Sequence, residues 1–425
     1  MTLLVCGQDM LGAVLPLVTA PLGYSRGIIS ARCAEIKLPN RRTQRDDSDE
    51  QHKNWSIAVY IYQYAEWPKF HWNIEIIAVR TAAVRHRMGK LAGRLEALGL
   101  PVREDALVGV FTTDVVKTSE IEGDTLDQDQ VRSSVARHLG LDYGGVRARD
   151  RLIDGVVAMV LDATQRCAEP LTRERLFTWH AGLFPTGDRD IKQISVGAWR
   201  EDRTGPMEVI SGAIGRIRVH FRALPAADIP AEMERFLAWF ETSNAFDPVI
   251  KAALSHLWFV TLHPFDDGNG RIARAIADMA LARAESGSQR FYSMSSQIRT
   301  ERNDYYNILE RTQKGNLDVT PWLCWFLDCL ERAITSSETA LGDVLRKSLF
   351  WKQHGLKDIN SRHKAVLSRL LDGFIGHLTS SKYAKLAKCS QDTAARDLNQ
   401  LVALGVMTKG SARGRSTAYE LVLAD

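Results

Sequence analysis

Apolar positions recur at helical spacing along most of this chain. The pattern predicts a helix over residues 74–98, ended by Gly99-Leu100-Pro101, and a second helix over residues 105–123. Further helical segments are predicted over residues 130–184 and again over residues 230–340. Because three- and four-residue spacing dominates these stretches, the sequence predicts a mainly α protein.

One stretch has a different period. Ile217, Val219 and Phe221 alternate with arginine and histidine, which is the period of two that a half-buried strand shows. Val209-Ile210 lies on the other side of a glycine-containing turn at residues 211–215. The stretch therefore predicts a β-hairpin within the helical protein.

The two ends of the chain differ from the middle. Residues 41–53 are strongly polar, so the compact protein is expected to begin near Trp55. The last segment follows a basic, polar stretch at residues 352–364 and is predicted to form a separate unit. We expect a disordered leader at 1–54, an N-terminal helical domain at 55–104, a core at 105–340 and a C-terminal domain at 360–425.

The composition excludes several classes of protein. Of 425 residues, 45% are hydrophobic and 25% charged, a globular balance that excludes a fibrous or disordered chain. The net charge of +4 provides no chain-wide basic field, so any nucleic-acid site must be local. Six scattered cysteines lack zinc spacing and suit a reducing compartment. The apolar N-terminal run lacks a basic start and is interrupted by Asp9, so we expect a cytoplasmic protein without a membrane span.

The segment HPFDDGNGRIAR, residues 263–274, concentrates the chemically active side chains. The hydrophobic run before it, residues 249–262, predicts a helix, and Gly268-Asn269-Gly270 predicts a tight turn into the next helix. Such a turn directs several backbone N–H groups and the positive end of the helix dipole toward one point. That geometry binds phosphate groups.

Four side chains of this segment add to the predicted phosphate site. Arg271 and Arg274 are three residues apart, so they share one helix face and can reach the same anion. Asp267 places a carboxylate where Mg²⁺ bridging two phosphates would bind. His263 supplies a group that titrates near neutral pH.

The same segment resembles the signature HxFx(D/E)GNGRxxR of the Fic family of nucleotidyl transferases and matches it at every fixed position. The resemblance implies a helical core that binds ATP with Mg²⁺ and transfers AMP to a Ser, Thr or Tyr hydroxyl of a target protein, which includes the protein itself. It also implies the role of each residue: His263 as the base, Asp267 as the Mg²⁺ ligand, Gly268, Asn269 and Gly270 at the α-phosphate, Arg271 at the α- and β-phosphates, Arg274 at the γ-phosphate, and Phe265 packed inward to fix the loop.

A second motif, TSEIEG at residues 118–123, places two carboxylates in the last turn of a predicted helix. The negative end of the helix dipole disfavours them there by ~0.3–1 kcal/mol, so a partner arginine is expected. The motif resembles the inhibitory pattern [S/T]xxxE[G/N] of Fic proteins, with Thr118 and Glu122 at its fixed positions. The resemblance implies that Glu122 pairs with Arg274 and denies it to the γ-phosphate; two solvated glutamates are the alternative. It also allows Glu122 to orient a water for removal of AMP, so the direction of the reaction stays open.

Two further features have alternative interpretations. The hairpin around Val219-His220-Phe221 resembles the Fic flap, which aligns an extended target segment by strand addition; an ordinary hairpin is the alternative. Asn303, Tyr305 and Tyr306 are candidates for an adenine pocket, because an amide and aromatic edges suit a base. Packing of the two tyrosines in the core is the alternative.

The C-terminal segment resembles a winged helix. A helix over residues 391–404, capped by Ser390, precedes a basic hairpin tip. Arg396, Arg413 and Arg415 are candidates for DNA contact, whereas protein docking or dimerisation is the alternative. The whole prediction is a mainly α protein with a Fic-type helical core, a β-hairpin flap and a small α/β winged-helix domain. Two functions follow, a protein adenylyltransferase inhibited by Glu122 or a nucleotide-sensing, DNA-binding transcription regulator.

Overall fold

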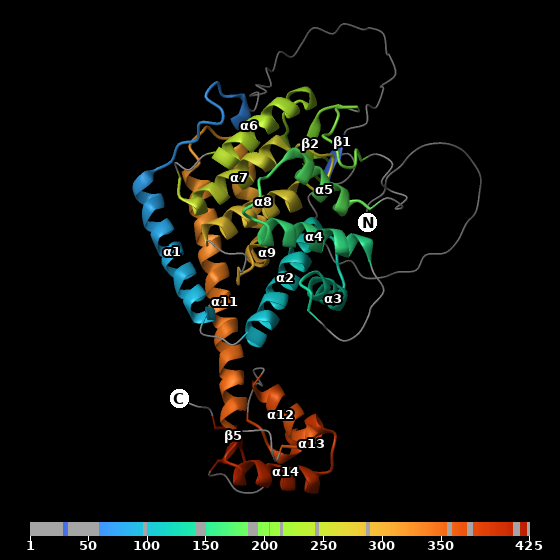
Figure 1. Cartoon of the computed structure of the whole chain (residues 1–425), viewed down its shortest axis with the longest axis vertical. Helices are drawn as coiled ribbons and strands as arrows, with labels where there is room; N and C mark the ends of the chain where they lie inside the picture. The colour runs from blue at the N-terminus through green and yellow to red at the C-terminus, as the bar shows by residue number, and fades with distance from the viewer. Residues whose placement is uncertain are drawn as a thin grey trace, which may run out of the picture.

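One long helix, α11 (Thr320–His354), joins a large helical body to a small C-terminal unit (Figure 1). The computed structural model confirms the mainly α class predicted from the sequence. Among the described residues, no helix is both long and apolar enough to cross a membrane. The structure describes residues 29–32, 59–96, 100–141, 150–185, 194–203, 205–212, 216–242, 246–285, 290–354, 359–371, 377–410 and 417–422, without the side chains of 29–32, 100–102, 343–346 and 348–349.

The helices of the body begin where the sequence provides caps. Asp127, Asp150, Thr172, Asp247 and Ser293 each accept a hydrogen bond from a backbone N–H two or three residues later, which satisfies a donor of the first helical turn. The helices are α1 (Ile74–Glu96), α2 (Leu100–Glu122), α3 (Gln128–His138), α4 (Arg151–Gln165), α5 (Arg173–Leu183), α6 (Ile229–Thr242), α7 (Pro248–Leu262), α8 (Asn269–Ala284), α9 (Met294–Thr300) and α10 (Arg302–Gln313), with short 3₁₀ turns at Ile61–Gln63 and Ala226–Asp228.

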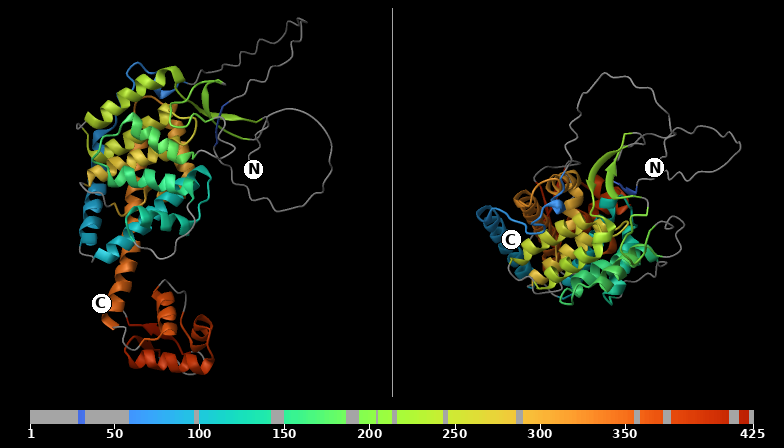
Figure 2. Two further views of the ribbon diagram at one scale, coloured as in Figure 1. Left: turned by 45° about the vertical axis from the view of Figure 1, so that its right-hand side comes forward. Right: turned by 90° about the horizontal axis from the view of Figure 1, so that it is seen from above.

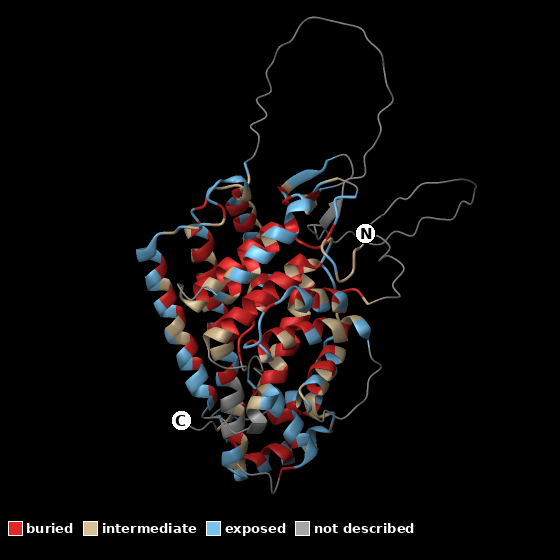
Figure 3. Ribbon diagram, turned by 45° about the horizontal axis from the view of Figure 1, so that its top comes forward, coloured by how far each residue is buried: buried red, intermediate tan, exposed pale blue. Residues whose placement is uncertain are grey.

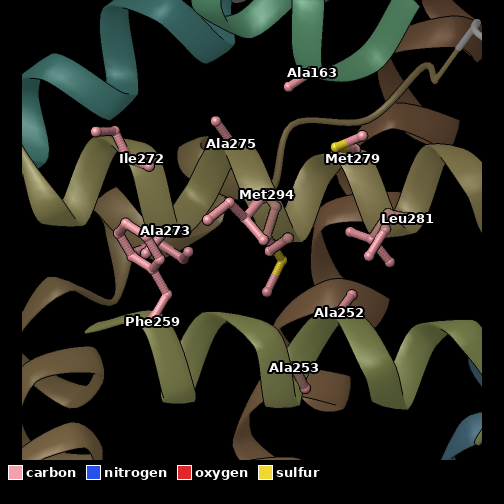
Figure 4. Close-up of a cluster of buried hydrophobic side chains, with 14 of the residues drawn as sticks. Ala163, Ala252, Ala253, Phe259, Ile272, Ala273, Ala275, Met279, Leu281 and Met294 are labelled. Atoms are coloured by element: carbon pink, nitrogen blue, oxygen red, sulfur yellow. The ribbon is translucent and has the colours of Figure 1, made fainter. Parts of the chain in front are cut away.

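Helices α7 and α8 form the centre of the body. Nearly every residue of both helices is buried (Figure 3), because other helices cover them on all sides. Small residues such as Ala252 and Ala273 lie between the two helices beside Phe259 (Figure 4), so the backbones can pack closely. The loop that joins α7 to α8 is the HPFDDGNG segment, which is thereby anchored at both ends in the core.

The predicted hairpin is present and projects from the body on the side away from α1 (Figure 2). Strands β2 (Met207–Ser211) and β3 (Arg218–Arg222) pair antiparallel, with Val209 opposite Phe221. A short strand β1 (Ile29–Arg32) pairs with the outer edge of β2. Of the expected leader at 1–54, the structure describes residues 29–32, which form β1; the unpaired N–H and C=O groups at the edge of β2 accept this strand.

The C-terminal unit has a hydrophobic core of its own, which includes Tyr383, Leu398 and Leu401. Ser390 caps its third helix, as the sequence predicts, and Thr379 caps its second. The expected domain boundaries at 104/105 and after 340 fall inside α2 and α11, since both helices continue without a break. The unit contains α12 (Ser361–Leu371), α13 (Ser380–Ala387), α14 (Gln391–Ala403), β4 (Met407–Lys409) and β5 (Tyr419–Leu421), with the two strands paired antiparallel.

Candidate active site

The turn between α7 and α8 is held by unusual backbone geometry. His263 ends α7 with a left-handed φ of 51°, and Gly268 precedes α8 with a φ of 79°. A non-glycine residue in this region costs roughly 1–2 kcal/mol, which the surrounding contacts must offset. The Asn269 side chain supplies two of them, since it accepts from the Phe265 N–H at 2.9 Å and donates to the Phe265 carbonyl at 2.8 Å. The Phe265 ring packs inward as predicted, stacked 4.2 Å from His180.

The first turn of α8 can accept an anion. It has no side-chain cap, so its N–H groups point toward the open end of the helix. Gly270 leaves room there: a Cβ at this position would lie 2.3 Å from Oε1 of Glu122. Arg271 and Arg274 are both buried, and Arg271 Nε and Arg274 Nη1 have no hydrogen-bond partner among the described residues. These buried donors suit a ligand with several phosphate oxygens.

His263 is placed as a neutral base. Its Nδ1 lies 3.0 Å from the Val260 carbonyl, so Nδ1–H donates there and the lone pair of Nε2 remains available. Burial lowers the pKa of His263 to about 4, and the nearby charge of Arg200 acts in the same direction. The imidazole is therefore unprotonated at neutral pH, which a residue that removes a proton requires.

Asp267 lies beside this histidine at the mouth of the turn. Its side chain is 54% exposed, and Oδ1 accepts from the Gly268 N–H at 2.6 Å. Asp267 Oδ2 is 3.9 Å from Arg271 Nη2, and Arg271 Nη1 is 3.4 Å from Asp124 Oδ2. The described residues contain no group of three or more protein side chains that could hold a metal ion. A single exposed carboxylate still fits Mg²⁺, which takes most of its ligands from water and substrate phosphates.

The end of α2 lies directly on Arg274. Arg274 Nη2 is 2.7 Å from Glu122 Oε1 and 3.0 Å from the Thr118 carbonyl, and its Nε donates to Thr118 Oγ1 at 2.7 Å. Burial by itself would raise the pKa of Glu122, but the charge and hydrogen bond of Arg274 outweigh it and hold the pKa below its ordinary value. Glu120 instead pairs with Lys117 and Arg299, so Glu122 is the carboxylate that contacts the predicted site.

Glu122, His263, Asp267 and the first two residues of α8 line one cleft. Tyr305 and Tyr306 both line it, but Tyr305 is also a core residue whose hydroxyl lies 2.9 Å from His256 Nε2. Asn303 is exposed in the first turn of α10 and does not line the cleft. The lining residues are Glu122, Val209, His220, Phe221, Val260, His263, Asp267, Asn269, Gly270, Tyr305, Tyr306, Leu309, Glu310 and Gln313.

Sequence reasoning missed the residues that support the turn from a distance. Arg200 is fully buried and its Nε donates to the His263 carbonyl at 2.8 Å, so it holds the strained residue in place. Arg302 Nε donates to the Ile121 carbonyl at 2.7 Å and so caps the end of α2. Both arginines lie far from their partners in the sequence, and no local motif marks either of them.

The C-terminal unit, which includes Arg396, lies at the opposite end of α11 from the helical body (Figure 1). Arg396 is exposed on α14, as the prediction requires. Arg413 and Arg415 lie outside the described residues.

Comparison with known proteins identifies two matching regions. Residues 170–281 match the family model described as "Fic/DOC family", and residues 60–141 match a "Domain of unknown function (DUF4172)". A relative from Drosophila virilis, named "Protein adenylyltransferase Fic", is 34% identical over 227 residues, which is 53% of this chain and 42% of the relative. The relative of the same name from Drosophila grimshawi is 35% identical over 119 residues, 28% of this chain and 23% of the relative.

The chain thus spans less than half the length of these curated relatives. Among solved structures, a Fic family protein from Desulfovibrio desulfuricans G20 aligns with a TM-score of 0.48 and 21% identity, over 83% of this chain and 97% of that chain.

Proposed function

We propose that this chain, whose residues 170–281 match the Fic/DOC family, is a protein adenylyltransferase, which moves AMP from ATP to a hydroxyl side chain of a target protein. The observation that carries the proposal is the cleft itself. A buried neutral imidazole and the open end of α8 line it, and two buried arginines with spare donors lie in the first two turns of that helix. This set suits a nucleotide triphosphate, because two guanidinium groups and the helix dipole match its several negative charges.

In the proposed reaction the target hydroxyl attacks the α-phosphate of ATP. Its oxygen forms a bond to phosphorus while the bond to the departing pyrophosphate breaks, and His263 Nε2 takes the proton. A positioned base of this kind contributes roughly 10²–10⁴-fold to the rate. The N–H groups of α8 and the Arg271 guanidinium stabilise the charge that develops on the phosphate oxygens, usually the largest catalytic contribution.

We propose that Asp267 would hold the Mg²⁺ that accompanies the nucleotide. Its exposed Oδ2 is directed to the same space as the first turn of α8. Bound there, the ion would neutralise phosphate charge and orient the leaving group.

Autoinhibition is the second part of the proposal. Glu122 accepts a hydrogen bond from Arg274 in this structure, and the Arg274 guanidinium would otherwise be available for the γ-phosphate. ATP then binds without placing its α-phosphate for attack. Glu122 also lines the cleft with His263, so the same side chain is placed to orient a water for AMP removal. Wild type should release AMP from a preloaded target, and Glu122→Gly should not, if that reverse reaction occurs.

Two surfaces are proposed for partners. The β2–β3 hairpin borders the cleft through Val209 and His220 and would align an extended target segment, by the strand addition that β1 already illustrates. The C-terminal unit presents Arg396 and Lys409 on its surface, which supports DNA contact as a second role; a salt-dependent shift of genomic DNA would test it. A homodimer contact through the core or through the C-terminal unit is also proposed. We propose a cytoplasmic location.

Transfer from labelled nucleotide tests the proposal. Glu122→Gly protein is incubated with Mg²⁺ and ATP carrying the label on either the α- or the γ-phosphate, alone and with a protein extract. An adenylyltransferase incorporates the α-label and not the γ-label into protein. Incorporation of the γ-label would indicate a kinase, and no incorporation in either case would support a nucleotide sensor instead.

A further inference from the structure

Three side chains at the edge of the cleft form a continuous hydrogen-bonded chain. Ser211 Oγ lies 2.5 Å from His220 Nε2, and His220 Nδ1 lies 2.6 Å from Glu310 Oε2. Ser211 ends β2, His220 is on β3 and Glu310 is on α10, so three separate elements bring them together. An acid that orients a histidine, which in turn accepts from a serine hydroxyl, is the arrangement that activates a serine as a nucleophile.

The charged groups around Glu310 determine which atoms of the three hydrogen-bonded side chains donate and which accept. Arg218 Nη2 donates to Glu310 Oε1 at 2.9 Å, and Lys314 Nζ donates to the same oxygen at 2.8 Å. Burial alone would raise the pKa of Glu310, but the hydrogen bonds from Lys314, His220 and Arg218 together lower it to about 2. The ionised carboxylate holds the proton of the ring on Nδ1, which leaves Nε2 to accept the proton of Ser211.

Two of the three hydrogen-bonded residues line the cleft of the proposed nucleotide site. His220 and Glu310 line the same cleft as His263 and Asp267, and Val209 on the strand of Ser211 lines it too. Gly212 follows Ser211 with a φ of 114°, and a Cβ there would lie 2.2 Å from the Arg216 carbonyl. Gly212 therefore lets the backbone bend immediately after the serine.

We propose that Ser211 is a self-modification site: an activated serine whose Oγ accepts the adenylyl group of ATP, with His220 as its base and Glu310 as the orienting acid. The inference rests on the proposed function for its ATP. In the step, a bond forms between Ser211 Oγ and the α-phosphorus, the bond from that phosphorus to the pyrophosphate oxygen breaks, and the hydroxyl proton moves to His220 Nε2. The products are a phosphodiester on the hairpin and free pyrophosphate.

The alternative is that the three residues only fasten the hairpin to α10. In that case Ser211 would have no unusual reactivity. An alkyl fluorophosphonate distinguishes the two roles without any nucleotide, because it reacts with activated serines and leaves ordinary ones unmodified. We expect Ser211 to be labelled in the full chain, and the rate to fall about 100-fold or more in His220→Gln, which keeps a polar side chain but removes the base.

The closing experiment locates the nucleotide. Full-length Glu122→Gly is incubated with Mg²⁺ and α-labelled ATP, and the modified peptides are identified by mass spectrometry. Ser211→Ala and His220→Gln are made in the same background, with Ser296→Ala as the control that removes a hydroxyl from α9.

The inference predicts an adenylyl group on Ser211, lost in Ser211→Ala, reduced about 100-fold in His220→Gln and unchanged in Ser296→Ala. Label on other residues with Ser211 unmodified would overturn this inference and leave the proposed function standing. Absence of label from every residue and from added protein would overturn both. Fluorophosphonate labelling that is the same in wild type and His220→Gln would also overturn the activation of Ser211.

Discussion

The pKa of His263 sets the acid limit of the proposed transfer. Burial lowers that pKa to about 4, and the base works only when it is unprotonated. The single-turnover rate of Glu122→Gly should therefore be level from about pH 8 down to about pH 5 and fall only as the pH approaches 4. Circular dichroism across the range confirms that the protein stays folded. A rate that falls around pH 6.5 would contradict the buried, neutral histidine.

Thr118 provides a weaker test of the inhibitory contact than Glu122. Its hydroxyl accepts the Nε–H of Arg274, a charge-assisted hydrogen bond worth roughly 1.5–3 kcal/mol. Thr118→Val should raise basal transfer, but by less than Glu122→Gly, because the ion pair remains. Thr113→Val is the matched control, since Thr113 lies on the same helix and its hydroxyl bonds to the Gly109 carbonyl. Equal effects of the two valines on transfer would show that α2 acts only as a scaffold.

The sequence identified the residues of the HPFDDGNGRIAR motif, but it did not identify the residues that hold the motif in place. The contact between Glu122 and Arg274 follows from two local patterns, and the structure has it. Arg200 could not be found in the same way, because its role depends on a carbonyl 63 positions away. Asn303 was chosen for its amide, but it is exposed in the first turn of α10 and does not line the cleft.

At the scale of elements, an ion network inside the body joins α2 to α8. Arg290 is fully buried and contacts Asp114 on α2 at 2.8 Å and Asp278 on α8 at 2.6 Å. Arg290→Met leaves two buried carboxylates without their partner and should lower the free energy of unfolding by about 3–5 kcal/mol in urea titrations. Arg80→Met removes a half-exposed pair with Asp328 and should cost at most about 1 kcal/mol. Similar losses for both variants would contradict the burial of the network.

Helices and the hairpin were predictable because their periods are local. The sequence predicted a helix over 74–98 and the structure has α1 at Ile74–Glu96; the hairpin and the cap at Ser390 also agree. The pairing of β1 with β2 and the full length of α11 were not predictable from local sequence. β1 forms only because the edge of β2 is free to pair with it, and the length of α11 depends on packing against both the body and the C-terminal unit.

The whole molecule contains two main hydrophobic cores along one chain. The larger core extends to Leu341 on α11, and the core of the C-terminal unit begins with Phe350 on the same helix. A chain that ends at residue 342 should therefore fold and, with Glu122→Gly, transfer AMP at the rate of the full-length variant. Circular dichroism and single-turnover transfer measure this. Loss of helical content or of transfer in the shortened chain would show that the two cores depend on each other.

Arg274 contacts either Glu122 or the nucleotide, and His263 performs the transfer to other proteins once Arg274 is free. The most direct measurement compares incorporation of α-labelled ATP into the proteins of an added extract by wild type, Glu122→Gly and the double variant Glu122→Gly/His263→Ala. We predict little label in wild type, strong label in Glu122→Gly and none above background in the double variant. Equal label in wild type and Glu122→Gly, or label that survives the loss of His263, would contradict the account.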